Sequence, residues 1–339
     1  MIPRPMWAAC GLWLVSRAVT SAAGAGVGAT VDAVRELADS VALRTDGSGL
    51  RQRLAQDGYL FFRALLRPDD VAAAYDSVRA ELRLGGWTDG DGHPLGQQRA
   101  VNIRDALADP SFRAALASRG LNRLAYLAPL RGLVRLILGP AAFSYPVKVL
   151  RTVYPEPPFQ VSRGRFIHQD LAVSGVQDML TTWLPLMDIP AELGGLAVLP
   201  GSHRGPPPRR RLLMADEPGW ATTNFRPGDV LLFHCLTSHA ALPNHANRLR
   251  ISSDVRWQGI GHAAPAELVL GPTAGQARRG PQVELFSRLL SREPWWEPVP
   301  SGLMLQPRRQ LVSVPPAPSR LFTMHPAWKR WRPPAASVH

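Results

Sequence analysis

Apolar residues recur at helical spacing along the part of the chain that precedes Pro140. The clearest helix is expected to begin at Pro68, because proline fits the first turn and the carboxylates of Asp69 and Asp70 favour the positive end of a helix. This helix should end at Gly85. Its buried stripe should consist of Val71, Ala74, Tyr75, Val78 and Leu82. The other elements expected here are a weak helix over 31–43, helices over 50–56, 111–116 and 121–138, a break at Pro129, and a short strand over 58–62.

Beyond Pro140 the pattern changes to short runs rich in Val, Leu, Ile, Phe, Trp and Thr, separated by Gly, Pro, Asn and Asp. Such closely spaced runs predict the strands of a β-sandwich or jelly roll. The expected strands cover residues 147–154, 165–171, 180–187, 195–199, 229–236 and 249–257. Because helices come first and strands follow, we expect an α+β fold in which helices flank a β core.

Three regions are expected along the 339 residues of the chain. Residues 1–49 should form a partly disordered N-terminal extension. Its apolar stretch is similar to a secretory signal, but Arg17 closes that stretch after about ten residues. Residues 50–264 should contain the folded domain. Residues 265–339 should form a C-terminal extension rich in Pro, Arg and Trp, with one helix near 282–290.

The formal net charge of +13 invites a nucleic-acid hypothesis. Almost all of this charge is arginine, however, and the arginines are scattered without an aromatic-interleaved basic stripe. The densest run, residues 209–211, follows three prolines and is typical of a solvated loop. We therefore expect no nucleic-acid partner. The arginine excess instead favours an anionic small molecule as the substrate.

Two cysteines, Cys10 and Cys235, are too few for a disulfide framework or a cysteine zinc site. A reducing cytoplasm is therefore the expected location, and Cys235 should be a small buried apolar residue. No apolar run reaches the roughly 18–20 residues that a membrane-spanning helix needs, so no membrane partner is expected.

The candidate metal ligands are His168, Asp170 and His239. On a strand, residues two apart point to the same face, so His168 and Asp170 are expected to face one ion together. His239 should lie just beyond the end of the strand over 229–236. Two histidines and one carboxylate leave open positions for substrate and O₂, which is typical of non-haem Fe(II) oxygenases. A structural zinc site would need a fourth ligand, for which the sequence has no candidate.

His234 competes with His239 for the role of third ligand. It precedes His239 by an odd number of residues, so the two would face opposite sides of an unbroken strand. We therefore expect His234 to be a core histidine or to support the ligands.

The strand over 249–257 carries the last group of candidates. Alternation places Arg250, Ser252, Asp254 and Arg256 on one face. Polar residues on an inward face are costly unless they bind something. Arg250 can hold a carboxylate through two parallel hydrogen bonds, and Ser252 can add a third. The alternative is a solvated outward face on which Asp254 pairs with Arg256.

These three groups follow one another in an order that resembles the phytanoyl-CoA dioxygenase family of Fe(II)- and 2-oxoglutarate-dependent oxygenases. The resemblance extends from about Leu50 to about Gln258. It also includes Gln56-Asp57-Gly58-Tyr59, Thr182-Trp183-Leu184-Pro185-Leu186-Met187-Asp188 and Gly194-Gly195-Leu196-Ala197-Val198-Leu199-Pro200-Gly201-Ser202-His203. His-x-Asp alone is a weak signal, whereas the combined set is specific.

The resemblance implies a double-stranded β-helix, which is a jelly-roll or cupin-like core, with flanking N-terminal helices. It implies that His168, Asp170 and His239 hold Fe(II). Arg250 would bind the distal carboxylate of 2-oxoglutarate, with Ser252 assisting. The implied reaction consumes O₂, releases succinate and CO₂, and oxidises a small molecule, with ascorbate as an additive in vitro.

Four further expectations follow from the same resemblance. Lys148 should contact cosubstrate or substrate, with a solvent-facing lysine as the alternative. Trp183 should pack the barrel, and His203 should be structural. Halogenating members carry a small residue where Asp170 stands, so we expect hydroxylation or another oxidation in place of halogenation.

Two other classes of function remain as alternatives. The first is a non-catalytic binding protein that keeps the barrel. The second is a cupin-type metal-dependent hydrolase or isomerase, which would not need the pair Arg250 and Ser252. Release of succinate distinguishes the dioxygenase from both.

Overall fold

The computed structural model describes residues 34–95, 103–146, 148–156, 166–176, 178–205, 218–269 and 300–307, together with Leu311, Ser319 and Leu321. Several sequence expectations lie outside these residues. They are the N-terminal stretch that is similar to a signal, the arginine run over 209–211, the helix near 282–290 and the tryptophans of the tail.

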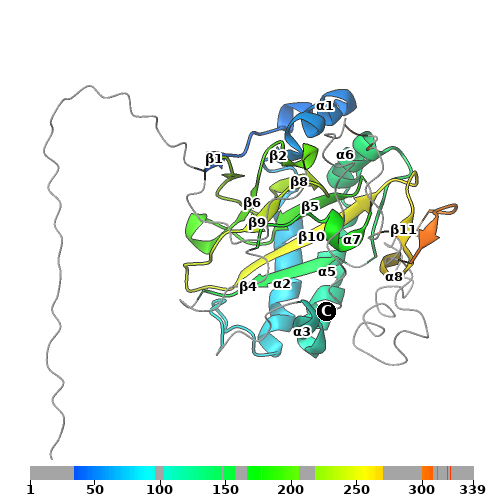
Figure 1. The fold of residues 1–339 in the computed structure, drawn as a ribbon. Helices are drawn as coiled ribbons and strands as arrows, with labels where there is room; N and C mark the ends of the chain where they lie inside the picture. The colour runs from blue at the N-terminus through cyan, green and yellow to red at the C-terminus, as the bar shows by residue number, and fades with distance from the viewer. Residues whose placement is uncertain are drawn as a thin grey trace, which may run out of the picture. The chain divides into compact units, whose positions relative to one another are not determined.

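Helices occupy most of the described chain before Pro140 (Figure 1). They are α1 (Gly47–Asp57), α2 (Pro68–Leu84), α3 (Ile103–Ala108), α4 (Pro110–Ala117), α5 (Arg119–Arg123) and α6 (Ala128–Leu138), with single 3₁₀ turns at Val41–Leu43 and Leu124–Tyr126. The stretch expected as one broken helix is thus divided, and Pro129 lies in the first turn of α6. Two short helices follow later, α7 (Leu171–Ser174) and α8 (Ala266–Val269).

The strands form two main sheets and a small one. The six-stranded sheet has the order β2-β8-β5-β10-β3, and β4 also pairs with β10. Its strands are β2 (Tyr59–Phe62), β3 (Phe143–Ser144), β4 (Val149–Val153), β5 (Leu180–Pro185), β8 (Val230–His234) and β10 (Arg250–Gln258). The four-stranded sheet has the order β1-β7-β6-β9 and contains β1 (Arg35–Glu36), β6 (Leu196–Val198), β7 (Ala221–Thr222) and β9 (His239–Ala241). The small sheet pairs β11 (Ala264–Pro265) with β12 (Leu305–Gln306).

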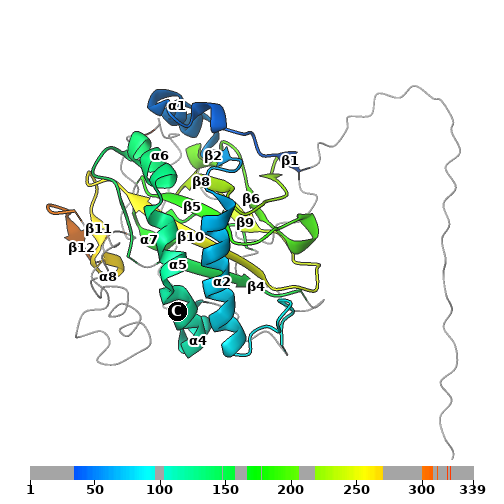
Figure 2. The same ribbon diagram turned by 180° about the vertical axis from the view of Figure 1, so that it is seen from behind.

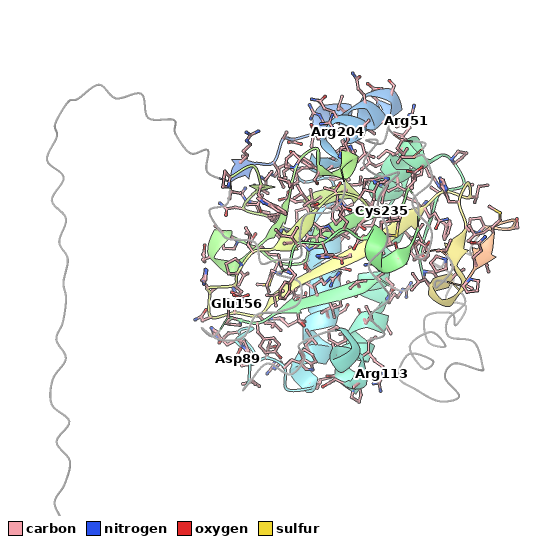
Figure 3. The ribbon with its side chains drawn as sticks, viewed as in Figure 1. Arg51, Asp89, Arg113, Glu156, Arg204 and Cys235 are labelled. Atoms are coloured by element: carbon pink, nitrogen blue, oxygen red, sulfur yellow. The ribbon has the colours of Figure 1, made fainter. Side chains whose placement is uncertain are left out.

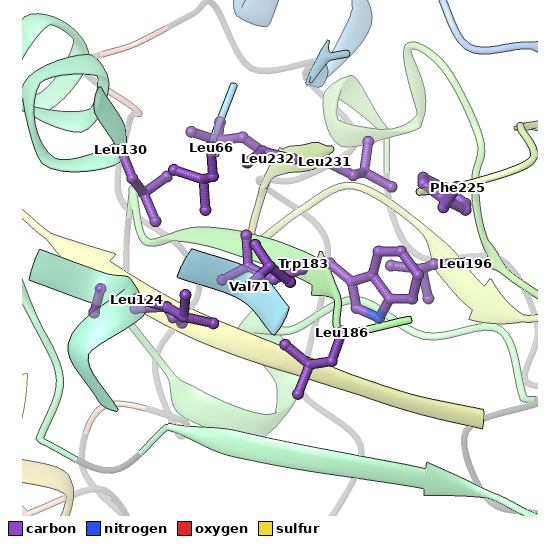
Figure 4. Close-up of a cluster of buried hydrophobic side chains, with 14 of the residues drawn as sticks. Leu66, Val71, Leu124, Leu130, Trp183, Leu186, Leu196, Phe225, Leu231 and Leu232 are labelled. Atoms are coloured by element: carbon purple, nitrogen blue, oxygen red, sulfur yellow. The ribbon is translucent and has the colours of Figure 1, made fainter. Parts of the chain in front are cut away.

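The helices cover one face of the six-stranded sheet. Figure 2 shows α2 and α5 in front of β10 and β4. Along β8, Leu232 lies in the apolar cluster that includes Val71 of α2 and Leu130 of α6 (Figure 4). The next residue, Phe233, points to the other side and lies 4.5 Å, ring centre to ring centre, from His239 of β9. The two main sheets therefore approach each other on the side away from the helices.

The structure corrects two local expectations and refines a third. No helix covers the described part of residues 31–43: Arg35 and Glu36 pair with β7 in a parallel bridge, and Val41–Leu43 is a single 3₁₀ turn. The strand expected over 165–171 is reduced, in its described part, to isolated bridges before α7 begins. His239 does lie beyond the end of β8, but it opens β9 in the other sheet.

Charge and sulfur are distributed much as the sequence suggests. Arg51, Arg113 and Arg204, labelled in Figure 3, stand on three separate elements. Cys235 is a free cysteine with no exposed surface, as expected for a small buried apolar residue. Among the described residues, no helix is long and apolar enough to cross a membrane.

Helix α2 offers a matched test of this packing. Leu82 is fully buried in the main apolar cluster, whereas Leu84, two residues further along, is 83% exposed. Leu82→Ala should lower the free energy of unfolding by about 2–5 kcal/mol, because it removes buried methyl groups and leaves a cavity. Leu84→Ala should change it by less than about 0.5 kcal/mol. Urea denaturation followed by circular dichroism gives both values, and equal effects would contradict the described packing.

Candidate metal and carboxylate site

The structure brings His168, Asp170 and His239 together. One ligand atom from each lies within 4.8 Å of the others, and the distance from His239 Nε2 to Asp170 Oδ1 is 3.9 Å. The two imidazole rings are 4.2 Å apart, centre to centre. Two imidazole nitrogens and one carboxylate oxygen converging on one point suit a divalent transition metal such as Fe(II).

Backbone pairing positions the two histidines. The His168 N–H donates to the His239 carbonyl at 3.1 Å, and the His239 N–H donates to the His168 carbonyl at 3.0 Å. Asp170 reaches the same point in another way than expected. It precedes α7 in a helical conformation, so a turn, and not strand alternation, directs its carboxylate towards His239.

Each histidine is fixed in the tautomer that a metal ligand needs. His168 Nδ1 lies 2.8 Å from the Phe166 carbonyl, and His239 Nδ1 lies 3.0 Å from the Thr237 carbonyl. A carbonyl oxygen only accepts, so each Nδ1 must carry the proton and donate it. The lone pair of each Nε2 is then available to a metal, an arrangement in which outer hydrogen bonds orient the ligands.

The carboxylate of Asp170 is held from two sides. The Thr181 hydroxyl donates to Oδ2 at 2.8 Å, and Arg256 Nη2 lies 3.6 Å from Oδ1. Burial raises the pKa of Asp170, but the positive charge of Arg256, the two neighbouring histidines and the Thr181 hydrogen bond outweigh burial, so that its pKa lies well below the ordinary value. Asp170 is therefore ionised, as a metal ligand must be.

The histidines are neutral for the complementary reason. Burial, followed by the proximity of His239, lowers the pKa of His168 to about 4. Burial also lowers the pKa of His239. Neither ring has to lose a proton before it can bind a metal at neutral pH, so the three side chains are prepared as ligands.

Arg250 and Ser252 present unused donors on the inward face of β10. Both side chains are buried, and Arg250 Nη1 donates to the Gly194 carbonyl at 2.8 Å. Among the residues that the structure describes, Arg250 Nε and Ser252 Oγ have no hydrogen-bond partner. Burial lowers the pKa of Arg250 to about 10, so the guanidinium stays charged at neutral pH. Buried donors without partners are costly, and a carboxylate would satisfy them.

Gly194, whose carbonyl accepts from Arg250, lies in a tight turn. Its φ of +73° lies in the left-handed region, and a Cβ there would stand 2.3 Å from the carbonyl oxygen of Pro243. Only glycine fits this turn. The guanidinium of Arg250 also lies over the Trp183 ring, 5.7 Å from its centre.

The outward, solvated alternative for this strand is wrong. Asp254 is buried, and it pairs with Arg151 of β4, whose Nε and Nη2 lie 2.9 and 2.7 Å from Asp254 Oδ2. Asp254 thus pairs across strands, and Arg256 lies beside Asp170. The alternating polar residues of β10 line the interior.

Lys148 lies apart from this group. It is fully buried, so the solvent-facing alternative is wrong. Its ammonium donates to the Tyr145 carbonyl at 2.7 Å and lies 5.2 Å from the ring centre of Tyr126, in the helical layer. Burial lowers the pKa of Lys148 to about 7. These contacts belong to the side of the sheet that the helices cover, opposite Arg250.

The remaining histidines have structural surroundings. His234 Nε2 lies 3.2 Å from Asp178 Oδ1, and its ring is fully buried. His203 Nε2 contacts the Ala55 carbonyl at 3.0 Å. Trp183 packs edge-on against Phe225, with ring centres 4.7 Å apart, in agreement with its expected role in packing.

The sequence pattern does not identify two residues that hold the carboxylates of this site, Thr181 and Arg151. Each lies on a strand that the sequence predicts, but the residues that its side chain contacts depend on the register with the neighbouring strands. Thr181 stands opposite Arg256 and Phe233 in neighbouring strands, while Arg151 stands opposite Ser252. Strand pairing brings together residues far apart in sequence, which a single-strand pattern does not specify.

Comparison with known proteins agrees with this geometry. A family model described as phytanoyl-CoA dioxygenase matches residues 54–252. That span includes the three candidate metal ligands, Arg250 and Ser252.

Several known proteins are similar to the chain. The 1-deoxypentalenic acid 11-beta-hydroxylase of Streptomyces arenae is 26% identical over 263 residues, covering 67% of this chain and 86% of that protein. The enzyme of the same name from Streptomyces exfoliatus is 27% identical over 259 residues, with the same coverage. Among solved structures, the epimerase SnoN is 20% identical with a TM-score of 0.47, and the match covers 77% of this chain and 95% of that one.

The assignment of the third ligand is directly testable. His168→Ala, Asp170→Ala and His239→Ala should each lower Fe(II) affinity by more than about 100-fold, a larger loss than outer hydrogen-bond partners cause. His234→Ala should retain iron binding, because His234 contacts Asp178 and not the ligands. Anaerobic Fe(II) titration gives the affinities, with circular dichroism as the check on folding. Iron binding lost in His234→Ala and kept in His239→Ala would reverse the assignment.

Thr181 provides a second test of the metal site. Thr181→Val keeps the side-chain shape but removes the hydroxyl that donates to Asp170, so the affinity for Fe(II) should fall by about 10–100-fold. Thr181→Ser should restore most of the loss. If Thr181→Val bound Fe(II) as tightly as the wild type, the hydroxyl would have no role in orienting Asp170.

Proposed function

The chain belongs to the phytanoyl-CoA dioxygenase family of Fe(II)- and 2-oxoglutarate-dependent oxygenases, and we propose that it hydroxylates a small organic molecule. In this proposal His168, Asp170 and His239 hold Fe(II), and Arg250 with Ser252 binds the distal carboxylate of 2-oxoglutarate. The observation that supports this proposal is that three side chains suited to bind a metal converge on one point. The neighbouring strand face carries buried donors that have no hydrogen-bond partner among the described residues.

The donor set fits both groups. Two neutral imidazoles and an ionised carboxylate are the facial set that Fe(II) accepts, with positions left for other ligands. A guanidinium and a hydroxyl on one strand face suit a carboxylate. When bound, Fe(II), 2-oxoglutarate and O₂ supply the oxidising chemistry and release succinate and CO₂.

The chain's own residues have the tasks of binding and orientation. The backbone carbonyls of Phe166 and Thr237 hold the two imidazoles in the ligand tautomer. Thr181 fixes one oxygen of Asp170 and leaves the other directed at His239. Phe233 packs against His239 with the two rings tilted by 46°, and the His239 side chain is buried.

The proposal also covers the fold of the domain, its boundaries in the chain and the location of the protein in the cell. We expect the two facing sheets to form a double-stranded β-helix over residues 50–264, to which β1 adds an edge strand from the N-terminal region. The C-terminal residues 265–339 would be an extension to this domain. A cytoplasmic location is proposed from the low cysteine content.

The names of the relatives support hydroxylation as the outcome. Two of them are 1-deoxypentalenic acid 11-beta-hydroxylases, enzymes named for adding a hydroxyl group to a small carboxylic acid. Asp170 occupies the position that the resemblance links to hydroxylation, as opposed to halogenation. Lys148 is not proposed as a contact for the cosubstrate, because its partners lie on the helical side of the sheet.

The reaction class is tested by supplying Fe(II), 2-oxoglutarate, ascorbate and O₂ and measuring succinate. A dioxygenase should release succinate in an Fe(II)-dependent way and do so faster with its substrate. A non-catalytic barrel or a cupin-type hydrolase or isomerase would release none above the iron-free control. The Asp170→Ala variant serves as the inactive protein of the same fold.

Arg250 is the test of the cosubstrate site. Removing a buried guanidinium that faces a carboxylate costs roughly 2–5 kcal/mol. Arg250→Ala should therefore raise the 2-oxoglutarate requirement by about 30-fold or more. Arg250→Lys should recover only part of this, because an ammonium lacks the planar fork. Anaerobic titration of 2-oxoglutarate against the iron-loaded protein, followed through the absorption of the chelate, measures the change.

The matched control is Arg248→Ala. Arg248 precedes β10 and is exposed, so its loss should have little effect on 2-oxoglutarate binding. Fe(II) binding should survive in both variants, since neither arginine is a ligand. Unchanged affinity in Arg250→Ala, or a larger loss in Arg248→Ala, would place the cosubstrate elsewhere.

A further inference from the structure

We propose that the substrate carries a carboxylate and that Arg256 binds it beside the metal. This inference rests on the proposed function and names the class of substrate. It begins from the charges of the described side chains on this face of the sheet: Arg250 and Arg256 are positive, and Asp170 is negative. The buried carboxylate of Asp254 is neutralised by Arg151, whose side chain is 36% exposed. Each histidine directs its Nδ1 proton to a backbone carbonyl, so an imidazole whose Nε2 binds a metal adds no charge.

The charged side chains on this face have one positive charge in excess when no ligand is bound. Fe(II) adds two positive charges and 2-oxoglutarate adds two negative ones, so the excess of one persists in the loaded enzyme. An unbalanced charge in a water-poor interior is costly. A substrate with one carboxylate would remove this cost, whereas a cationic substrate would increase it.

Two of the three arginines already have defined partners. Arg151 contacts Asp254 Oδ2 through two of its nitrogens. Arg250 is buried, and its Nη1 donates to the Gly194 carbonyl. Its remaining donors are those that the proposed function assigns to 2-oxoglutarate. Neither has a full charge to offer to another anion.

Arg256 differs from both. Its Nε has no hydrogen-bond partner among the described residues, although the atom is buried. Its Nη2 lies 3.6 Å from Asp170 Oδ1, too long for a good hydrogen bond. The side chain is 15% exposed, compared with 3% for Asp170.

Metal binding makes this guanidinium more available. Asp170 Oδ2 already accepts from Thr181, and Oδ1 points to His239, where the metal would lie. Once the charge of Asp170 is committed to Fe(II), Arg256 shares its only described carboxylate neighbour with a dication. Its planar fork then suits a bidentate carboxylate from outside the protein.

The position suits the substrate better than the cosubstrate. Arg250 and Arg256 share the face of β10 but are six residues apart, which corresponds to about 20 Å of extended strand. 2-Oxoglutarate has only two carboxylates, of which one is assigned to Arg250 and the other to the metal. A third carboxylate beside Asp170 would belong to the substrate, close to the site of oxidation.

The experiment compares acids with their uncharged amides. The probes are cyclohexanecarboxylate, phenylacetate and decanoate, each paired with its primary amide. Binding to the anaerobic Fe(II)–2-oxoglutarate protein is measured through the change in the absorption of the chelate. At least one acid should bind the wild type about 30-fold more tightly than its amide. In Arg256→Gln that preference should disappear while the affinity for the amide is kept, and Arg256→Lys should restore part of it.

Arg248→Gln is the matched control, because it removes an exposed arginine just before the same strand and should keep the acid preference. The inference is overturned if no acid binds more tightly than its amide or if Arg256→Gln retains the preference. It is also overturned if Arg256→Gln weakens 2-oxoglutarate binding as much as acid binding, since Arg256 would then serve the cosubstrate. Failure of the wild-type chelate to form would instead refute the proposed function.

Discussion

The charged inner face of β10 is the constraint on which the rest of the structure depends. This strand pairs with β5 along one edge and with β4 and β3 along the other, so its backbone is largely used in ladders. Its inward side chains include two guanidiniums and a carboxylate. Burying such groups costs several kcal/mol each, roughly, unless partners compensate. Arg151, Asp170 and the Gly194 carbonyl supply that compensation from three other parts of the chain.

This polar interior is tolerated because the opposite face of β10 is apolar. Ile251 and Val255 alternate with the charged residues of β10 and join the cluster that includes Val71 and Val78 of α2. The helices thus bury the apolar face of this strand, which stabilises the domain. The side facing the second sheet is left free to hold groups chosen for binding. One strand carries both functions because its side chains alternate between the two faces.

The same alternation explains how much of the fold and the site the amino-acid pattern can predict. Helix α2 and the shared face of the polar residues of β10 each depend on spacing within one segment, so the residue pattern alone predicts both. Alternation does not decide whether that face points inward, because this depends on the elements that pack against the strand. A turn at the start of α7 directs the carboxylate of Asp170 towards the two histidines, and His239 is the first residue of a strand in a different sheet. Such features depend on pairing between distant segments. Thr181 escapes prediction for that reason: its partner Asp170 lies across a register that local patterns do not encode.

The residues around Arg250 also show why such a site is not simply optimised for stability. Arg250 Nε, Ser252 Oγ and Arg256 Nε are buried donors without partners among the described residues. Each would be cheaper as an apolar group of similar shape, or as a donor with an internal acceptor. An internal acceptor, however, would occupy the position that an incoming carboxylate needs. A ligand that accepts from these donors and binds only the folded state stabilises that state. The stability of the fold and its affinity for ligands therefore depend on the same few donors. A substitution that gave these donors an acceptor within the protein would raise the stability and lower the affinity.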